Sequence, residues 1–165
     1  MPTAKARQAC EGVFNLSRIP RVNTYEISTD PRRLQLAAIH AYLTRSYWSP
    51  GIPEDVVARA IANSLCFGLY VAGTGTQVGF ARVITDKSSF AYLADVYVLE
   101  EHRGQGLSKR LVQAVLAHPE LQGMRRFLLA TRDAHGLYEQ FGFKAPARPD
   151  NFMEIRTPPA WLLPE

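Results

Sequence analysis

The segment Asp95-Val-Tyr-Val-Leu-Glu-Glu-His-Arg-Gly-Gln-Gly-Leu-Ser-Lys-Arg-Leu111 decides the fold of this chain. It has the pattern of a hydrophobic strand, a short polar turn, a glycine-interrupted basic loop and an amphipathic helix. The loop at residues 103–108 opens that helix, so its backbone presents unpaired N–H groups and the positive end of the helix dipole. Such a loop can hold a phosphate or pyrophosphate, and Arg103 adds a fixed positive charge beside it.

Spacing excludes two familiar phosphate-binding loops. The dinucleotide pattern G-x-G-x-x-G and the Walker pattern G-x-x-x-x-G-K-[ST], each begun at Gly104, both require glycine at position 109, which is Lys109. A lone G-x-G before a helix is often only a tight turn, so this loop needs a second signal elsewhere in the chain.

The loop resembles the R/Q-x-x-G-x-G/A motif of the GNAT N-acetyltransferase superfamily. Arg103 fills its first position and Gly106 its first glycine, while Ser108 stands where the family usually has glycine or alanine. A second segment, Leu137-Tyr-Glu-Gln-Phe-Gly-Phe143, resembles the closing l-Y-x-x-x-G-F signature of the same family. The two matches occur in the family's order, and the resemblance covers about residues 66–145.

Composition narrows the classes of protein to which this chain can belong. The chain has 165 residues, of which 47% are hydrophobic, enough for one domain with a sizeable core. No apolar run is long enough to cross a bilayer, and the basic N-terminus lacks the apolar centre of a secretory signal. With only Cys10 and Cys66, we expect no disulfide framework and a cytoplasmic setting.

The net charge of +4 and pI near 9.3 are compatible with nucleic-acid binding. Much of the excess lies in the N-terminal tail, and the remainder gathers at the glycine loop, where Arg103, Lys109 and Arg110 cluster. A polyanionic cofactor such as coenzyme A accounts for that cluster, so we expect neither a nucleic-acid nor a membrane partner. The sequence leaves open whether the chain acts as a monomer or a homodimer.

Patterning predicts a basic extension at residues 1–22, one domain at residues 23–157 and an irregular tail at residues 158–165. The domain is expected to be α/β, with a mixed, mainly antiparallel sheet flanked by helices, as in the GNAT fold. We expect strands at about 23–29, 66–72, 77–85, 90–99, 125–131 and 151–156, and helices beginning at Asp30–Pro31 and covering about 53–63, 106–118 and 134–141.

The resemblance implies acetyl-CoA as co-substrate. The loop would hold the pyrophosphate, the edge of the preceding strand would pair with the pantetheine arm and polarise the thioester carbonyl, and a residue at the end of the next strand would contact the cofactor. The implied cofactor-binding residues are Val96, Val98, Arg103, Gly104, Gln105, Gly106, Leu107, Ser108 and Thr131.

Two residues are candidates for catalysis. Tyr138 matches the family tyrosine that lies near the sulfur, where a phenol can protonate the departing thiolate; the alternative is a packing tyrosine. Asp95 is the nearest acid for deprotonating an amine, yet it could equally be a structural partner of an arginine or a helix end. Glu26 and His40 are the next candidates. Simple alternation places Asp95 on the strand face opposite Ala94, unless a β-bulge intervenes.

An aromatic cluster, Tyr42, Tyr47 and Trp48, is expected either to line the acceptor pocket or to pack in the core. The four histidines show no metal-ligand spacing, so no metal site is expected. The sequence therefore predicts an enzyme that moves an acetyl group from acetyl-CoA to a primary amine of a small molecule or protein. The alternative is a non-catalytic acyl-CoA-binding or sensor module of the same fold.

Overall fold

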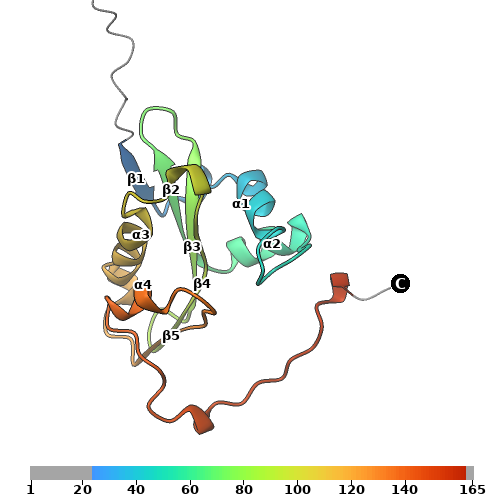
Figure 1. Cartoon of the computed structure of the whole chain (residues 1–165), viewed down its shortest axis with the longest axis vertical. Helices are drawn as coiled ribbons and strands as arrows, with labels where there is room; N and C mark the ends of the chain where they lie inside the picture. Colours follow the sequence, from blue (N-terminus) through green and yellow to red (C-terminus); the bar gives the residue numbers. More distant parts are fainter. Residues whose placement is uncertain (1–23, 163–165) are drawn as a thin grey trace, which may run out of the picture.

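The computed structural model describes residues 24–162, which form one mixed sheet with helices on both faces (Figure 1). The strands lie in the order β1-β2-β3-β4-β5. Strands β1 to β4 pair with one another in antiparallel fashion, and β5 runs parallel to β4. This architecture confirms the predicted fold class. The strands are β1 (Tyr25–Ser28), β2 (Leu65–Val71), β3 (Gln77–Thr85), β4 (Phe90–Val98) and β5 (Arg126–Leu129), and the α-helices of this part of the chain are α1 (Leu36–Leu43), α2 (Glu54–Ala62), α3 (Leu107–Leu116) and α4 (His135–Glu139).

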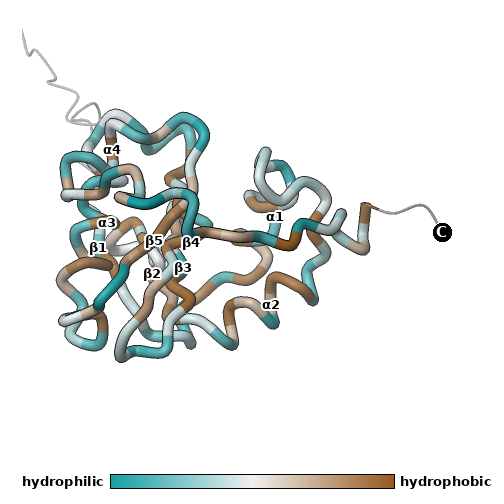
Figure 2. The backbone as a smooth tube through the Cα atoms, turned by 90° about the horizontal axis from the view of Figure 1, so that it is seen from below, coloured by the Kyte–Doolittle hydropathy of each residue, from teal (hydrophilic) through white to brown (hydrophobic). Residues whose placement is uncertain are grey.

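Two hydrophobic layers hold the helices against the sheet. Helices α1 and α2 cover one face, and α3 and α4 cover the other, so the sheet lies in the middle when viewed along its edge (Figure 2). The apolar residues of α3 recur at helical spacing, and Leu107, Leu111 and Val115 are all buried. The predicted extension, residues 1–22, lies outside the described residues.

The β2–β3 connection is the predicted hairpin. Residues 72–76 link the two antiparallel strands, and Gly73 and Gly75 both have positive φ angles, of 87° and 69°. Glycine occupies this region without steric cost, which explains why the G-x-G here serves a turn. Cys66 in β2 is buried, as predicted, and burial raises its thiol pKa to about 11.

The first helix begins later than predicted. Asp30 does cap a helical turn, because its carboxylate accepts from the Arg32 N–H at 3.0 Å, but that turn is a 3₁₀ helix of only three residues, Pro31–Arg33. The chain then extends until α1. Gln35 and Gln77 explain the break, since each side-chain oxygen accepts from the other residue's backbone N–H, at 2.8 and 3.1 Å. This long-range pair fixes Gln35 outside helical geometry.

The predicted final strand at 151–156 is wrong. Residues 149–151 form a 3₁₀ turn, and residues 152–159 have no regular secondary structure. Within residues 24–162, no strand pairs with the outer edge of β5. The alternating sequence of this segment therefore has no partner on which to form a ladder. The same part of the chain contains no helix long and apolar enough to span a bilayer, and the cytoplasmic setting stays a prediction.

Leu111 tests the layer beneath α3. Its side chain is fully buried against β2, β3 and β4, so Leu111→Ala should lower the free energy of unfolding by about 3 kcal/mol. Ile84 is a control, because it is an exposed aliphatic residue of β3, and Ile84→Ala should cost less than about 1 kcal/mol. Urea denaturation of both variants measures the difference; equal losses would contradict the assignment of α3 to the core.

Candidate active site

A cleft opens where β4 and β5 part. Their pairing runs only from Phe90 opposite Arg126 to Leu93 opposite Leu129. Strand β4 then continues to Val98 while β5 ends, so the edge of residues 94–98 is left without a neighbouring strand on that side. The cleft has a volume of about 400 Å³. It is lined by residues 93–98 of β4, Arg103 and Ser108 of the glycine loop and α3, Ala130, Thr131, Asp133 and Ala134 after β5, Leu137 and Tyr138 of α4, and Tyr42, Tyr47 and Trp48.

The glycine loop forms one end of this cleft. Gly104 and Gly106 have φ angles of 77° and 72°, and Gly106 is the N-cap of α3. The N–H groups of residues 104–109 donate to no acceptor in the described part of the chain, and no acidic side chain lies in the first turn of α3. These donors point from a helix N-terminus, which is a site that favours an anion.

Neighbouring side chains fix the loop in place. Arg110 donates to the Tyr25 carbonyl oxygen at 2.9 Å, and Gln105 donates to the Tyr25 hydroxyl at 3.2 Å. The same hydroxyl lies 2.9 Å from His102 Nδ1. Strand β1, at the far edge of the sheet, therefore anchors the loop.

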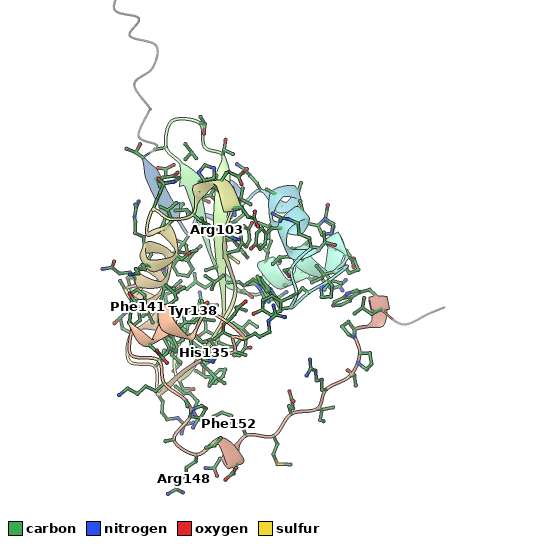
Figure 3. The ribbon with its side chains drawn as sticks, viewed as in Figure 1. Arg103, His135, Tyr138, Phe141, Arg148 and Phe152 are labelled. Atoms are coloured by element: carbon green, nitrogen blue, oxygen red, sulfur yellow. The ribbon has the colours of Figure 1, made fainter. Side chains whose placement is uncertain are left out.

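Arg103 is directed toward the sheet and α1 (Figure 3). Its Nε donates to the Val98 carbonyl oxygen at 2.9 Å, and its guanidinium also donates to the Tyr42 hydroxyl at 3.0 Å and to Glu100 at 3.2 Å. These bonds tie the loop to the end of β4 and to α1. The sequence pattern gave no indication of the bond to Tyr42, because that residue lies 61 positions away in α1.

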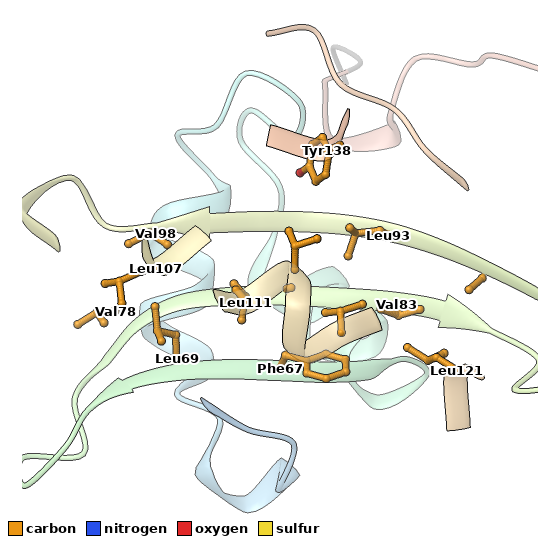
Figure 4. Close-up of a cluster of buried hydrophobic side chains, with 14 residues drawn as sticks. Phe67, Leu69, Val78, Val83, Leu93, Val98, Leu107, Leu111, Leu121 and Tyr138 are labelled. Carbon is orange, nitrogen blue, oxygen red and sulfur yellow. The ribbon is translucent and has the colours of Figure 1, made fainter. Parts of the chain in front are cut away.

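Tyr138 forms the α4 wall of the cleft. Its side chain is only 8% exposed and lies at the margin of the core on the α3 side, over β4 (Figure 4). The ring packs edge-to-face on Phe143, and its hydroxyl bonds to no group among residues 24–162. Burial raises its pKa to about 12, so the phenol stays protonated at neutral pH and can donate a hydrogen bond.

Asp95 lies on a β-bulge. Ala81 of β3 faces both Asp95 and Val96, because the register shifts between Phe80 and Arg82, and Asp95 has a φ of 54°. Because of the bulge, the Asp95 side chain points to the opposite sheet face from the one that simple alternation predicts. The Asp95 carboxylate turns toward Arg82, the residue paired with Ala94, and so lies on the α1 side of the sheet.

Two side chains bind the Asp95 carboxylate. Arg82 Nε donates to Oδ2 at 2.7 Å, and Trp48 Nε1 donates to Oδ1 at 3.2 Å. Only 15% of the Arg82 side chain and 10% of the Asp95 side chain are exposed. The pair with Arg82 is the structural role that the sequence allowed for Asp95 as an alternative to a catalytic one. The carboxylate also borders the cleft.

The remaining sequence candidates divide between the cleft and other places. Thr131 lines the cleft, and its hydroxyl accepts from the Ala134 N–H at 3.0 Å, which caps the turn before α4. Glu26 lies on β1 and forms an ion pair with Arg33. His40 lies 2.9 Å from the Ile52 carbonyl oxygen and 3.6 Å from Glu54. Neither Glu26 nor His40 lines the cleft.

The aromatic cluster divides between the core and the wall of the cleft. Tyr42 is buried and stacks on Tyr97 with ring centroids 3.7 Å apart, so it is a core residue with one edge at the cleft. Tyr47 and Trp48 are exposed on the cleft wall. Tyr47 donates to Asp133 at 3.4 Å, and the Arg132 guanidinium lies 3.8 Å from the centre of its ring. Asp133 lines the cleft but was not among the residues predicted from the sequence, although it follows Thr131 by two positions.

A single mixed sheet that is mostly antiparallel and flanked by helices is the architecture of acetyltransferase domains of known structure. A family model described as the acetyltransferase (GNAT) family matches residues 24–143, which is most of the chain. The chain belongs to this family and to its acetyl-transferring enzymes.

Three comparisons accompany this assignment. A crystal structure of a candidate GNAT-family acetyltransferase from Xanthomonas campestris is 51% identical, covers 85% of this chain and 98% of that chain, and has a TM-score of 0.81. A candidate acetyltransferase of Gibberella zeae is 38% identical over 135 residues, or 69% of this chain and 75% of its own length. A predicted acetyltransferase from Clostridium acetobutylicum, crystallised with acetyl-CoA, shares the fold at 14% identity and a TM-score of 0.59, covering 81% of this chain and 95% of that one.

The Asp95–Arg82 pair yields a stability prediction. Asparagine tolerates a positive φ as aspartate does, so Asp95→Asn removes the charge without adding backbone strain. The Arg82 guanidinium would then be largely buried without a counter-ion, and the free energy of unfolding should fall by about 3 kcal/mol. Removing both charges in Arg82→Gln/Asp95→Asn should recover about 1 kcal/mol or more. Chemical denaturation checks both values; a single variant as stable as the parent would contradict the ion pair.

Proposed function

We propose that this enzyme transfers the acetyl group of acetyl-CoA to a primary amine of a small molecule or protein. The row of free N–H groups at residues 104–109 supports the proposal most directly. It offers several donors to a pyrophosphate without a Cβ at Gly104 or Gly106 to hold the ligand away. The predicted acetyltransferase from Clostridium acetobutylicum, which has the same fold and was crystallised with acetyl-CoA, supports the choice of cofactor.

The open edge of β4 suits the rest of the cofactor. The backbone of Val96 and Val98 lies at the cleft beyond the last β4–β5 pair, where an amide-containing arm can pair with it as an added strand would. A free N–H at this edge can also polarise the thioester carbonyl, and Thr131 lies on the opposite wall. When bound, acetyl-CoA supplies an acyl carbon activated by its thiol leaving group.

Tyr138 and Asp95 would carry the proton transfers. As the amine nitrogen bonds to the acyl carbon and the carbon–sulfur bond breaks, the Tyr138 phenol gives its proton to the departing sulfur. Asp95 takes the proton lost by the amine, directly or through water, because its carboxylate oxygens each retain a lone pair after bonding Arg82 and Trp48. Solvent then returns a proton to Tyr138 and accepts the one on Asp95, so the cycle balances.

A non-catalytic acyl-CoA-binding module is the alternative. Both functions require binding at the loop, so calorimetry with acetyl-CoA tests what they share. A thiol-release assay against a panel of small amines and lysine peptides separates them. Turnover above the rate without enzyme supports the transferase, and tight binding with no release across the panel supports the module.

The loop assignment can be tested with two matched glycines. Gly106 and Gly75 have φ angles of 72° and 69°, and an added Cβ would meet nothing within 4 Å at either position. Gly106→Val and Gly75→Val should therefore cost similar stability. Only Gly106→Val should weaken acetyl-CoA binding, by about tenfold or more, since it places a branched side chain at the proposed pyrophosphate site. Calorimetry on the two folded variants measures the affinities. Equal affinities would contradict the assignment of the loop as the pyrophosphate site.

Tyr138→Phe tests the proposed acid. The ring stays against Phe143 while the hydroxyl is lost, so kcat should fall about a hundredfold with little change in acetyl-CoA affinity. Tyr70→Phe is the control, because Tyr70 is a fully buried tyrosine outside the cleft whose hydroxyl has no partner in the described structure. It should leave turnover unchanged. A decrease below about threefold for Tyr138→Phe would make Tyr138 a packing residue.

A further inference from the structure

The two ends of the cleft differ in charge. Arg103 borders the end nearest the glycine loop, and its guanidinium is already bonded to groups of the protein. Toward the other end, Asp95 of β4 and Asp133 after β5 line the cleft. Among the described residues of the lining, these three carry charge. The cofactor end is therefore positive, and the end left for the acceptor is negative.

Two aromatic side chains of the α1–α2 loop connect the two carboxylates. Trp48 Nε1 donates to Asp95 Oδ1 at 3.2 Å, and the Tyr47 hydroxyl donates to Asp133 Oδ1 at 3.4 Å. The two rings meet edge to face, with centroids 4.9 Å apart. Both aromatic residues and both carboxylates line the same cleft, so they form one continuous surface at its acceptor end.

The Asp133 carboxylate has room for a ligand. Its side chain is 62% exposed, its bond from Tyr47 is long for a hydroxyl donor, and the nearest Arg132 nitrogen lies 3.9 Å from Oδ2. Arg132 itself is not part of the cleft lining, because its guanidinium stacks on the Tyr47 ring, 3.8 Å from the ring centre. Each carboxylate oxygen therefore keeps a lone pair for a further donor.

Asp133 also lies close to the proposed acid. Burial is the main cause of the raised pKa of Tyr138, and the neighbouring Tyr47 and Asp133 raise that pKa further. The Tyr138 side chain is largely buried, and its hydroxyl has no partner among residues 24–162, so it can bond to a group in the cleft. A ligand group held by Asp133 is thus one short spacer away from a nitrogen that reacts between Asp95 and Tyr138.

This surface favours a compact acceptor with a second positive charge. A cation can bond to the Asp133 carboxylate beside the rings of Tyr47 and Trp48, whereas an acceptor with a carboxylate would meet two like charges. An aromatic acceptor has little free ring to stack on, since Arg132 and Trp48 both pack against Tyr47. The spacer must be short, because the cleft of about 400 Å³ also has to hold the acetyl end of the cofactor.

We propose that the acceptor is a short aliphatic diamine, whose second ammonium binds at Asp133 while its first nitrogen loses a proton to Asp95 and reacts. This inference rests on the proposed acetyl transfer. The carbon–sulfur bond breaks, an amide forms at the first nitrogen, and the sulfur leaves as a thiol with the Tyr138 proton. The second ammonium keeps its charge throughout. Asp133 is therefore a residue that determines specificity, and it takes no part in the proton transfers.

Three acceptors of equal length test the selectivity: diaminobutane, butylamine and aminobutanoate with a terminal amine. With saturating acetyl-CoA, kcat/KM measured by thiol release should be about tenfold or more higher for diaminobutane than for butylamine. Aminobutanoate should be the poorest acceptor. Added salt should reduce the preference, because Asp133 is partly exposed. Equal kcat/KM for diaminobutane and butylamine overturns the proposal and leaves the acetyltransferase assignment standing.

Asp133→Asn tests the residue, and Asp55→Asn is its matched control. Asp55 is an exposed carboxylate, 69% exposed, that also pairs with an arginine, but it lies on α2 outside the cleft. The preference for diaminobutane over butylamine should fall about tenfold in Asp133→Asn and stay unchanged in Asp55→Asn. Circular dichroism confirms that both variants fold. An unchanged preference in folded Asp133→Asn overturns the proposal.

Calorimetry with diaminobutane distinguishes failure of this inference from failure of the proposed function. With coenzyme A present, diaminobutane should bind the parent chain about tenfold more tightly than it binds Asp133→Asn, whether or not thiol is released. Binding that depends on Asp133 without any thiol release supports the dication site and overturns the transfer of acetyl to this acceptor. Diaminobutane binding that is absent, or equal in the two chains, overturns the site.

Discussion

The parting of β4 and β5 is the constraint on which the rest of this structure depends. Four residue pairs join the two strands, and the last is Leu93 with Leu129. Beyond that pair the backbone of β4 needs another partner for its outer edge, and the cleft forms there. The glycine loop, α3 and α4 all follow β4 or β5 in sequence, so the point of parting decides where their residues meet.

The bulge at Asp95 determines which side chains face each layer. Before the bulge, Ala91 and Leu93 pack toward α3; after it, Val96 and Val98 do so. Without the extra residue, Tyr97 would turn away from Tyr42, which it now stacks on in the α1 layer. The Asp95–Arg82 ion pair holds the bulge, and the cost of its positive φ is low for an aspartate. Asp95 therefore both holds the bulge and lines the cleft.

Sequence patterning predicted most elements because their signals are local. The strand–loop–helix order of residues 95–111, the hairpin glycines at 73 and 75, and the apolar stripe of α3 each reflect the geometry of a few neighbouring residues. The two errors arise from partners far away in sequence. Gln77 holds Gln35 out of a helix, and the segment at 151–156 lacks a strand beside it.

By itself, the sequence determined the fold class, the glycine loop at residues 103–108 and the placement of Tyr138 on a helix after β5, because backbone propensity and spacing fix these features. Only the tertiary structure decided that Arg103 would bond Val98 and Tyr42, that Asp95 would turn toward Arg82, and that Glu26 and His40 would lie outside the cleft. The Arg103–Tyr42 bond joins residues 61 apart, and the Asp95–Arg82 pair joins neighbouring strands. They depend on strand register and on one inserted residue, and neither leaves a periodic pattern in the sequence.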